Sequence, residues 1–379
     1  MKNKAICILS SVHFAHDVRM FQAEARTLAR AGFDVTEIAL EDDTESATDG
    51  VSIITLPPPR NRLSRFMRTG RILLIALRQN CDLYTIHDPE LLPLAVLLKI
   101  FKRRPVIYDV HEDVPASIRN RQWLPRPLRP ITAIIYRLIE RISLHFIAGL
   151  TIADHAYDKY YANCQTLTVL NYPLTSYADL YEKHVRSLRP PTLIYTGSIT
   201  RLRGLHEMIE IVQRLRLRYP DLTLRLVGPF GSNTDRTEAT QLIHRHDLEN
   251  HVEFTGPVSH AEVHRLILDA DVGLAILHPD PNYLHSLPTK MFEYMMMARP
   301  VVVSNFPMWE EIVEDCGCGY AIDPHDLDAI VSAIDSLLAD KSRRDNMGVQ
   351  GRIAVLKKYN WENEGARMIE FYRELMGMP

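Results

Sequence analysis

The segment that most constrains the fold of this chain runs from 285 to 304, HSLPTKMFEYMMMARPVVVS. Apolar residues recur at helical spacing after Pro288, which suits the first turn of a helix because its missing N–H costs nothing there. Pro300 ends the helix, and Val301 to Val303 form a β-branched run typical of a strand buried on both faces. This pattern indicates an α/β domain.

Two polar features interrupt the apolar pattern. The loop before Pro288 leads into a helix N-terminus, whose free N–H groups and positive dipole end attract anions. Glu293 follows roughly 8 Å along the helix axis, where its carboxylate offers a fixed hydrogen-bond acceptor. A nucleotide diphosphate needs this pair, with donors for its phosphates and a carboxylate for its ribose. The alternative interpretation is an ordinary buried helix and strand.

Length and composition set the broad class. A chain of 379 residues predicts two domains, and 46% hydrophobic with 24% charged residues is typical of a soluble globular protein. The net charge of −3 argues against nucleic-acid binding. Five scattered cysteines favour a reducing compartment. We find neither a signal-peptide pattern nor an apolar run that approaches about 18 residues, and therefore expect a cytoplasmic protein.

The first half of the chain alternates strand and helix patterns. Strands are predicted at 5–11, 34–40 and 51–57, with a helix from about 17 to 31 between the first two. No hairpin signal separates the strands, so the pattern predicts a doubly wound parallel sheet. The loop after the first strand contains His13, His16 and Asp17, side chains that either bind a ligand or cap the helix.

Two further strands end in histidines and carboxylates. The strand at 82–88 ends at His87, and the strand at 105–113 ends with Asp109, His111 and Glu112. Ligands of open α/β sheets bind beyond the carboxyl ends of the strands. The pattern therefore indicates a binding site, although a cap or supporting role remains open for each histidine.

The second half begins after Pro190-Pro191 with a strand that ends at Gly197. Glycine allows the backbone to approach an anion closely. Arg201 and Arg203 follow, and a guanidinium binds phosphate bidentately. The alternative is a surface loop that happens to hold two arginines.

Together these motifs resemble the GT-B glycosyltransferases, specifically the retaining family 4. The family motif has two Glu eight positions apart, followed by a small-residue turn, Pro and a hydrophobic strand. Glu293 matches the second Glu, whereas His285 stands at the first and Ala298 at the usual Gly. Arg203 matches the Lys that holds the donor diphosphate in the family. Ser198 stands where the family has an Arg, so Arg201 is expected to substitute for it.

The resemblance implies an α/β GT-B fold, with two Rossmann-like, doubly wound parallel-sheet domains facing a deep interdomain cleft. The acceptor-binding domain would span 1–175, and the donor-binding domain 190–360. The final helix, 361–376, would pack back on the first domain.

The resemblance also implies an activity, the transfer of a sugar from a nucleotide diphosphate sugar to a hydroxyl of a glycan or lipid-linked acceptor. The reaction would be retaining, would need no metal or other cofactor, and would serve bacterial cell-surface polysaccharide or glycoconjugate synthesis. The implied catalytic residues are His111, Arg203 and Glu293. The implied donor-binding residues are Gly197, Ser198, Arg201, Arg203, Val258, His285, Leu287, Pro288, Thr289 and Glu293. The implied acceptor-binding residues are His13, His16, Asp17, His87 and Glu112.

Positive charge gathers in one part of the chain. Between Arg60 and Arg141 there are sixteen Lys and Arg residues against seven acidic ones, a local excess of nine positive charges. The arginines of 60–78 and 119–141 alternate with apolar residues, a pattern that favours an anionic membrane surface over nucleic acid. We therefore expect peripheral binding to the inner face of the cytoplasmic membrane. Solvated surface helices are the alternative.

Two other functions remain open at this point. A sugar-nucleotide epimerase or phosphorylase on the same fold would use Glu112 or Asp113 as an acid or base. A non-catalytic nucleotide-sugar-binding subunit would explain why His285 replaces a Glu. The sequence identifies neither the donor sugar, its base nor the acceptor.

Overall fold

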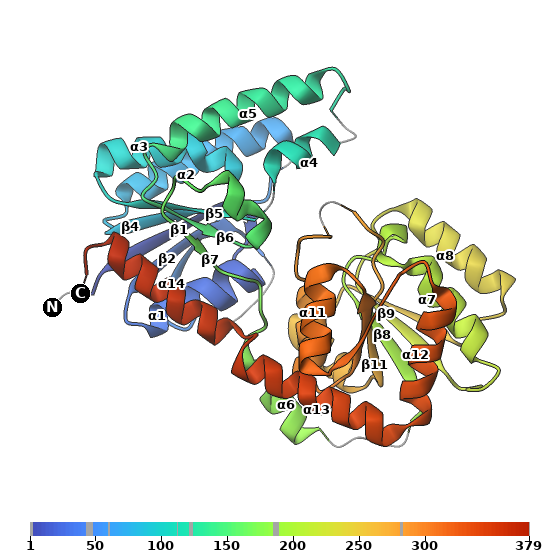
Figure 1. Cartoon of the computed structure of the whole chain (residues 1–379). Helices are drawn as coiled ribbons and strands as arrows, with labels where there is room; N and C mark the ends of the chain where they lie inside the picture. The colour runs from blue at the N-terminus through green and yellow to red at the C-terminus, as the bar shows by residue number, and fades with distance from the viewer. Residues whose placement is uncertain are drawn as a thin grey trace. The chain divides into compact units, whose positions relative to one another are not determined.

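The computed structural model describes residues 3–42, 48–59, 61–111, 113–120, 124–184, 189–280 and 283–378. It consists of two compact units, the first formed by Met1–Asn171 with Asn363–Pro379 and the second by Tyr172–Glu362 (Figure 1). The segment between the two predicted domains thus belongs to the second unit. The cleft that the family resemblance implies stays a prediction.

The first unit is built on a sheet of seven parallel strands in the order β3-β2-β1-β4-β5-β6-β7. The strand order reverses between β1 and β4, which is where ligands bind in sheets of this kind. The strands are β1 (Ala5–Phe14), β2 (Asp34–Leu40), β3 (Val51–Leu56), β4 (Leu83–Ile86), β5 (Val106–Val110), β6 (Gly149–Ile152) and β7 (Thr166–Thr168).

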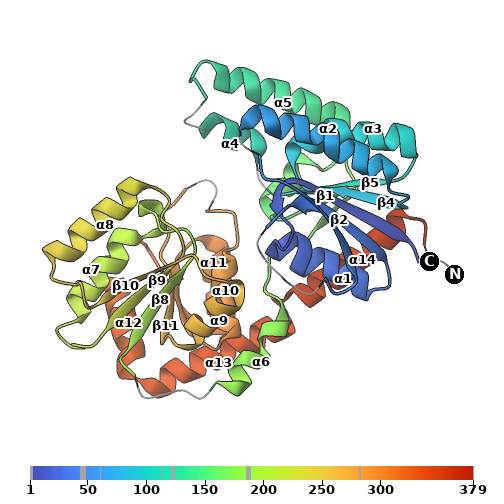
Figure 2. The same cartoon turned by 180° about the vertical axis from the view of Figure 1, so that it is seen from behind.

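Helices cover both faces of this sheet. Figures 1 and 2 show α2, α3 and α5 on one face and α1 with α14 on the other. Their bounds, with those of the short segments between them, are η1 (Val18–Ala25), α1 (Arg26–Arg30), α2 (Arg62–Arg78), η2 (Pro89–Leu91), α3 (Leu92–Lys102), α4 (Val114–Asn120), α5 (Leu128–Leu144), η3 (His155–Tyr160) and α14 (Trp361–Leu375).

The last helix returns to the first sheet from the far end of the sequence. The hydroxyls of Tyr372 and Thr85 lie 3.0 Å apart in the interior of the unit. A Cβ on Gly149 of β6 would meet the side chains of Phe371 and Leu375 at 2.7 and 2.8 Å. The glycine thus allows α14 to lie directly against the sheet.

The second unit has six parallel strands in the order β10-β9-β8-β11-β12-β13. They are β8 (Thr192–Thr196), β9 (Thr223–Val227), β10 (Val252–Gly256), β11 (Val272–Ala275), β12 (Val301–Ser304) and β13 (Gly319–Ile322). The two parallel sheets confirm the predicted pair of doubly wound α/β domains.

Two apolar layers enclose the second sheet. One layer includes α7 (Leu205–Leu215), α8 (Asn233–Arg245) and α12 (Leu327–Ala339), and the other includes α9 (His260–Leu268), α10 (Thr289–Met296), α11 (Pro307–Cys316) and α13 (Lys341–Lys357). The remaining short segments are η4 (Thr175–Tyr177), α6 (Asp179–Lys183) and η5 (Arg201–Arg203).

The segment 285–304 folds as the helix and strand that its sequence predicts. α10 begins directly after Pro288, and β12 follows Pro300. Ala298, which stands at the family's usual Gly position, has a φ of 52° in the left-handed region. An alanine therefore adopts there the conformation for which glycine is the usual choice.

No helix among the described residues is long and apolar enough to cross a membrane.

Candidate functional site

In the second unit, the carboxyl end of β8 leads to a turn at Gly197, whose φ of 119° favours glycine. A Cβ built on Gly197 would lie 3.5 Å from Arg203 Nη1 and 3.5 Å from Lys290 Nζ. Arg203 ends η5, and Lys290 lies in the first turn of α10. Two cations from separate elements therefore border the backbone of Gly197, an arrangement suited to an anion.

Aromatic rings hold these two cations. Arg203 Nε donates to the hydroxyl of Tyr283 at 3.2 Å, and Lys290 Nζ lies 4.9 Å from the centre of the Tyr195 ring. Burial, followed by repulsion from Arg203, lowers the pKa of Lys290 to about 7. Within the described ranges, no carboxylate oxygen lies at ion-pair distance from either cation.

The structure separates the two arginines that the sequence placed together. The side chain of Arg201 is exposed, and its backbone N–H donates to Asp235 Oδ1 at 3.0 Å. None of the three atoms nearest the missing Cβ of Gly197 belongs to Arg201. Lys290, which the sequence analysis missed, takes the place next to Arg203. Its position at the start of α10 is the signal that could have found it, because helix N-termini attract anions.

The predicted ribose carboxylate, Glu293, is 7% exposed. Its Oε1 lies 2.8 Å from Nε2 of His260, the first residue of α9. Burial alone would raise the pKa of Glu293, but the hydrogen bond to His260 and the nearby histidines lower it, so the carboxylate is ionised. Burial lowers the pKa of His264 to about 4, which keeps that ring neutral. His260 was not among the site residues predicted from the sequence.

The other predicted donor residues lie around α10 and the loop before it. His285 is exposed, whereas Leu287 and Val258 are half-buried and pack on the apolar core. Pro288 is the N-cap of α10, and no side chain caps the helix there, so its first N–H groups are open to an anion. Thr289 is the first residue of the helix.

In the first unit, the carboxyl ends of β1, β4 and β5 bring three histidines together. The rings of His87 and His111 stack with 5.4 Å between their centres, and the His13 ring lies 5.7 Å from that of His111. His111 Nε2 is 2.8 Å from Asp109 Oδ2, and His13 Nε2 is 3.7 Å from Asp88 Oδ1. The strand ends thus place paired histidines and carboxylates at one edge of the sheet.

Side chains of the π-helix η1 hold the histidine and carboxylate cluster in place through Asp109. Arg19 binds both oxygens of Asp109, at 2.9 and 3.1 Å, and its Nε lies 3.2 Å from Glu24 Oε1. Residues five apart share a face only in the wider π-helix, and η1 has this winding instead of the predicted α-helix. Burial alone would raise the pKa of Asp109, but Arg19 and His111 hold it well below its usual range. Arg19 and Glu24 carried no signal in the sequence.

The side chain of His87 has no exposed surface, although the residue lines the cavity described below, and its predicted acceptor role stays a prediction. It lies between Glu24 Oε2 at 3.3 Å and Asp109 Oδ2 at 3.2 Å because η1 covers the end of β4. Its interactions hold Asp109 and His111 in position.

The other predicted acceptor residues have structural partners. Asp17 caps η1 by accepting from the N–H groups of Arg19 and Met20, and Asp42 holds the ring of His16 at 2.8 Å. Glu112 lies outside the described residues.

A cavity of about 720 Å³ extends from these strand ends. His13, Asp88 and His111 line its polar end, and Arg65 and Glu90 lie beside them. Its remaining wall is mostly apolar and comes from α3, α4, α5 and the segment before α5, with Pro93, Val114, Ile118, Leu124, Ile135 and Ile139. The cavity therefore has a polar end at the strand ends and a mostly apolar wall elsewhere.

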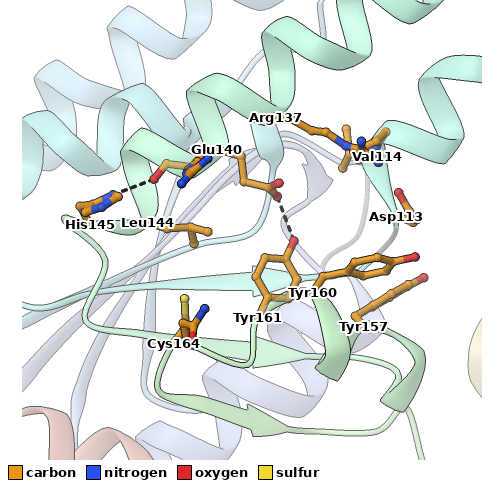
Figure 3. Close-up of a pocket in the computed structure, with 13 residues that line it drawn as sticks. Asp113, Val114, Arg137, Glu140, Leu144, His145, Tyr157, Tyr160, Tyr161 and Cys164 are labelled. Carbon is orange, nitrogen blue, oxygen red and sulfur yellow. Dashed lines mark hydrogen bonds between the residues drawn. The ribbon is translucent and has the colours of Figure 1, made fainter.

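A second cavity, of about 830 Å³, lies between α5 and η3 (Figure 3). Glu140 points across it toward Tyr161, whose hydroxyl donates at 2.9 Å, and accepts a second bond from Tyr136 at 3.0 Å. Burial raises the pKa of Glu140. The two tyrosine hydroxyls thus fix the position of the Glu140 carboxylate in this cavity.

Among the residues that the structure describes, two groups of side chains have potential metal-ligand atoms within 4.8 Å of one another, His87 with Asp109 and His111, and His260 with His264 and Glu293. In both, a carboxylate already accepts a hydrogen bond from a histidine. The expected metal independence stays a prediction.

Family models match both halves of the chain in order. Residues 18–154 match the model described as Glycosyltransferase Family 4, and residues 178–353 match the model described as Glycosyl transferases group 1.

Curated relatives are glycosyltransferases with partial matches. The chain is 28% identical over 189 residues to D-inositol 3-phosphate glycosyltransferase of Corynebacterium urealyticum, a match that covers 49% of this chain and 43% of that protein. It is 29% identical over 184 residues to a GDP-mannose-dependent alpha-(1-6)-phosphatidylinositol monomannoside mannosyltransferase of Mycolicibacterium smegmatis. This match covers 48% of this chain and 47% of that protein. These matches thus span less than half of either relative.

Solved structures share the fold along the whole chain. Sucrose-phosphate synthase from Thermosynechococcus elongatus superimposes with a TM-score of 0.73 at 17% identity, covering 99% of this chain and 100% of the other. The Anabaena protein HepE, solved in complex with UDP-glucose, gives a TM-score of 0.70 at 15% identity. The superposition covers 98% of this chain and 99% of HepE. The two family models, the relatives and this shared fold agree, and the protein belongs to the GT-B glycosyltransferases of the family 4-like group.

Proposed function

We propose that the protein transfers a glycosyl group from a nucleotide diphosphate sugar to an acceptor hydroxyl, with retention of configuration and without a metal. The observation that carries this proposal is the anion site of the second unit. Arg203 faces the Gly197 backbone, and the uncapped N-terminus of α10 lies on the same edge of the sheet as the ionised Glu293. These groups match the diphosphate and the ribose of a nucleotide sugar.

The leaving diphosphate gains negative charge as its bond to the sugar breaks. Positive groups fixed where that charge develops lower the barrier, because they need no rearrangement during the reaction. Arg203 and the N–H groups of α10 would serve this role. His111, oriented by Asp109, would contact the reacting sugar or the acceptor hydroxyl at the polar end of the first unit's cavity.

The donor class is testable by calorimetric titration of the protein with UDP-glucose, GDP-mannose, ADP-glucose and dTDP-glucose. The first two are the donors that the names of a relative and a solved structure contain. We expect one nucleotide to bind, and Glu293→Ala and Arg203→Ala each to weaken its binding at least tenfold, or about 1.4 kcal/mol.

Glu311→Ala on α11 is the control, since that side chain is exposed. A folded protein that binds none of the four nucleotide sugars would contradict the proposal. Consumption of a nucleotide sugar without any acceptor would favour the epimerase or phosphorylase instead, and an inverted product would contradict retention.

We further propose that the acceptor is a glycan or a lipid-linked molecule met at an anionic membrane surface, in bacterial cell-surface polysaccharide or glycoconjugate synthesis. α5 supports this proposal best, because one broad face of it is exposed and apolar. The exposed residues are Leu128, Ile131, Ile134, Ile135, Leu138, Ile139 and Ile142. The exposed Arg126, Arg137 and Arg141 flank this face and suit anionic lipid headgroups.

The arginines of α2 contribute less to this surface than their spacing predicts. Arg65 pairs with Glu90, and the buried Arg68 donates to the carbonyl of Ser11 at 3.4 Å. Both thus face the strand ends. Arg60 and the side chain of Arg62 lie outside the described residues.

Vesicle sedimentation tests the membrane proposal. The variant Ile131→Lys/Ile134→Lys should lose most binding to vesicles that contain phosphatidylglycerol, because each lysine must be withdrawn from the apolar interface. Ile353→Lys on α13 is a matched control, since Ile353 and Ile131 are both 53% exposed. Equal binding by all three proteins would reject α5 as the contact.

A further inference from the structure

We infer that Lys290 supplies the second positive charge for the donor diphosphate and takes up a proton from solvent when the donor binds. This inference rests on the proposed function and extends it to a residue at which the family resemblance predicts no role.

The geometry places Lys290 inside the anion site. Its Cε and Nζ both lie 3.5 Å from the Cβ position of Gly197, as does Nη1 of Arg203. An anion against the Gly197 backbone would therefore meet an ammonium from α10 on one side and a guanidinium from η5 on the other. Lys290 belongs to the first turn of α10, whose N–H groups no side chain caps.

The protein does not neutralise this pair by itself. In the part of the chain that the structure describes, Lys290 Nζ has neither a hydrogen bond nor an ion pair, and Arg203 donates to the neutral hydroxyl of Tyr283. Two neighbouring positive groups without an anion between them repel each other, which is costly in a half-buried place. A bound diphosphate would remove this repulsion and gain attraction to both groups.

Ser198 replaces an arginine of the family, which explains why a second cation from Lys290 matters for this site. Ser198 stands at the position of a family arginine, and none of the three atoms nearest the Cβ position of Gly197 belongs to the exposed Arg201. Lys290 reaches the site from a different element and so restores a second cation. The substitution is not equivalent, because a guanidinium stays charged whereas a half-buried amine can lose its proton.

The charges around Lys290 set the direction of the pH effect. Burial and Arg203 lower the pKa of Lys290 to about 7, while Glu293, one helical turn further along α10, raises it in part. The other groups that face the site are Tyr195, Tyr283 and the His260–His264 pair behind Glu293. Near pH 7 the amine is therefore only partly protonated in the free protein, and a doubly negative diphosphate raises its pKa.

Binding that raises a pKa takes up protons and weakens as pH rises through the pKa of the free group. Donor affinity should be constant well below pH 7 and should fall by up to about tenfold per pH unit above it. The diphosphate diester of a nucleotide sugar does not titrate in this range, so the protein is the source of the effect.

Isothermal titration calorimetry with UDP-glucose and GDP-mannose tests the inference. Titrations in buffers of different ionisation enthalpy, at about pH 6, 7 and 8, give the number of protons taken up. For the wild type we expect uptake near zero at pH 6 that approaches one proton at pH 8. Lys290→Met should bind at least tenfold more weakly at pH 6 and should show no uptake.

Two further variants separate charge from packing. Lys290→Arg keeps a permanent charge, so it should bind as well as the wild type at pH 6, more tightly at pH 8, and without proton uptake. Arg245→Met at the end of α8 is the matched control, since that side chain is exposed, and it should behave as the wild type. Circular dichroism would establish that each variant is folded.

The possible failures are distinguishable. If the wild type binds a nucleotide sugar and Lys290→Met matches it in affinity and uptake, the inference about Lys290 is wrong and the proposed function stands. Proton uptake that persists in Lys290→Arg would also overturn the inference. If the folded wild type binds neither nucleotide sugar at any pH, the proposed function fails and the inference fails with it.

Discussion

Glu37 lies in the middle of β2 with no exposed surface, and neither of its carboxylate oxygens has a hydrogen-bond partner among the described residues. Burial raises its pKa to about 8, and the nearby carboxylates of Asp17, Glu24 and Asp42 add to this effect. The side chain is therefore protonated at neutral pH in the folded protein, whereas it ionises near pH 4.5 in the unfolded chain. Its burial thus makes folding less favourable as pH rises between these two values.

The substitution Glu37→Gln should remove this penalty. We expect the free energies of unfolding of the variant and the wild type to be similar near pH 4.5, and the variant to be more stable by about 4 kcal/mol at pH 8. Chemical denaturation across this pH range measures the difference. The exposed Glu41 just beyond the strand offers a control in Glu41→Gln, and a constant difference between variant and wild type at all pH values would contradict the assignment.

At the scale of elements, glycine decides how closely two helices of the second unit pack. A Cβ on Gly348 of α13 would lie 2.2 Å from the carbonyl oxygen of Ala298, at the C-terminus of α10. This separation is too short for any contact between heavy atoms, and backbone cannot move as a side chain does. The packing of α13 against α10, which holds Lys290 and Glu293, therefore requires glycine at 348.

Gly348→Ala should accordingly destabilise the second unit by about 2 kcal/mol or more. Gly70→Ala in α2 should do the opposite and stabilise the first unit by about 0.5–1 kcal/mol, because Gly70 is exposed, has no neighbour within 4 Å of a Cβ, and alanine is the better helix former. Thermal and urea unfolding of the two variants provide the measurement. Equal effects of both substitutions would mean that helix propensity, and not the contact at Ala298, governs Gly348.

At the scale of the whole molecule, the chain leaves the first unit after Asn171 and returns to it at Asn363. The returning helix buries Met368, Phe371 and Tyr372 almost completely. Each of these side chains contributes about 1.5–3 kcal/mol of hydrophobic stabilisation. Their sum is comparable to the whole stability of an ordinary domain, about 5–15 kcal/mol.

A chain that ends at Glu362 should therefore contain an unfolded first unit and a folded second unit. Calorimetry should give one thermal transition for this truncation, and limited proteolysis should leave a fragment that begins near Tyr172. A chain that ends at Met376 is the control and should unfold as the wild type. Survival of the first unit in the shorter chain would show that α14 is not part of its core.

The sequence by itself determined most of the helices and strands and the class of the fold, although not the π-helical winding of η1. Apolar residues at helical spacing between Pro288 and Pro300, followed by a β-branched run, predict α10 and β12 because periodicity and backbone restriction act locally. The histidines and carboxylates at the strand ends were predictable for the same reason. Parallel strands present their carboxyl ends at one edge, so His13 and His111 were expected at the same edge of the sheet, and the strand order brings their rings to 5.7 Å.

Only the tertiary structure decided which of these side chains face a ligand and which support it. Arg19 and Asp109 are 90 positions apart, so no local sequence pattern predicts their bidentate ion pair. The burial of His87 beside Asp109 is equally invisible in the sequence. Lys290, for which no role was predicted, lies beside Gly197 where Arg201 was expected, because the direction of a side chain depends on the turn or helix that carries it. The spacing of charged residues along the sequence does not give the distances between them in the fold. Those distances decide which residues form the anion site, and they depend on how the helices and strands pack.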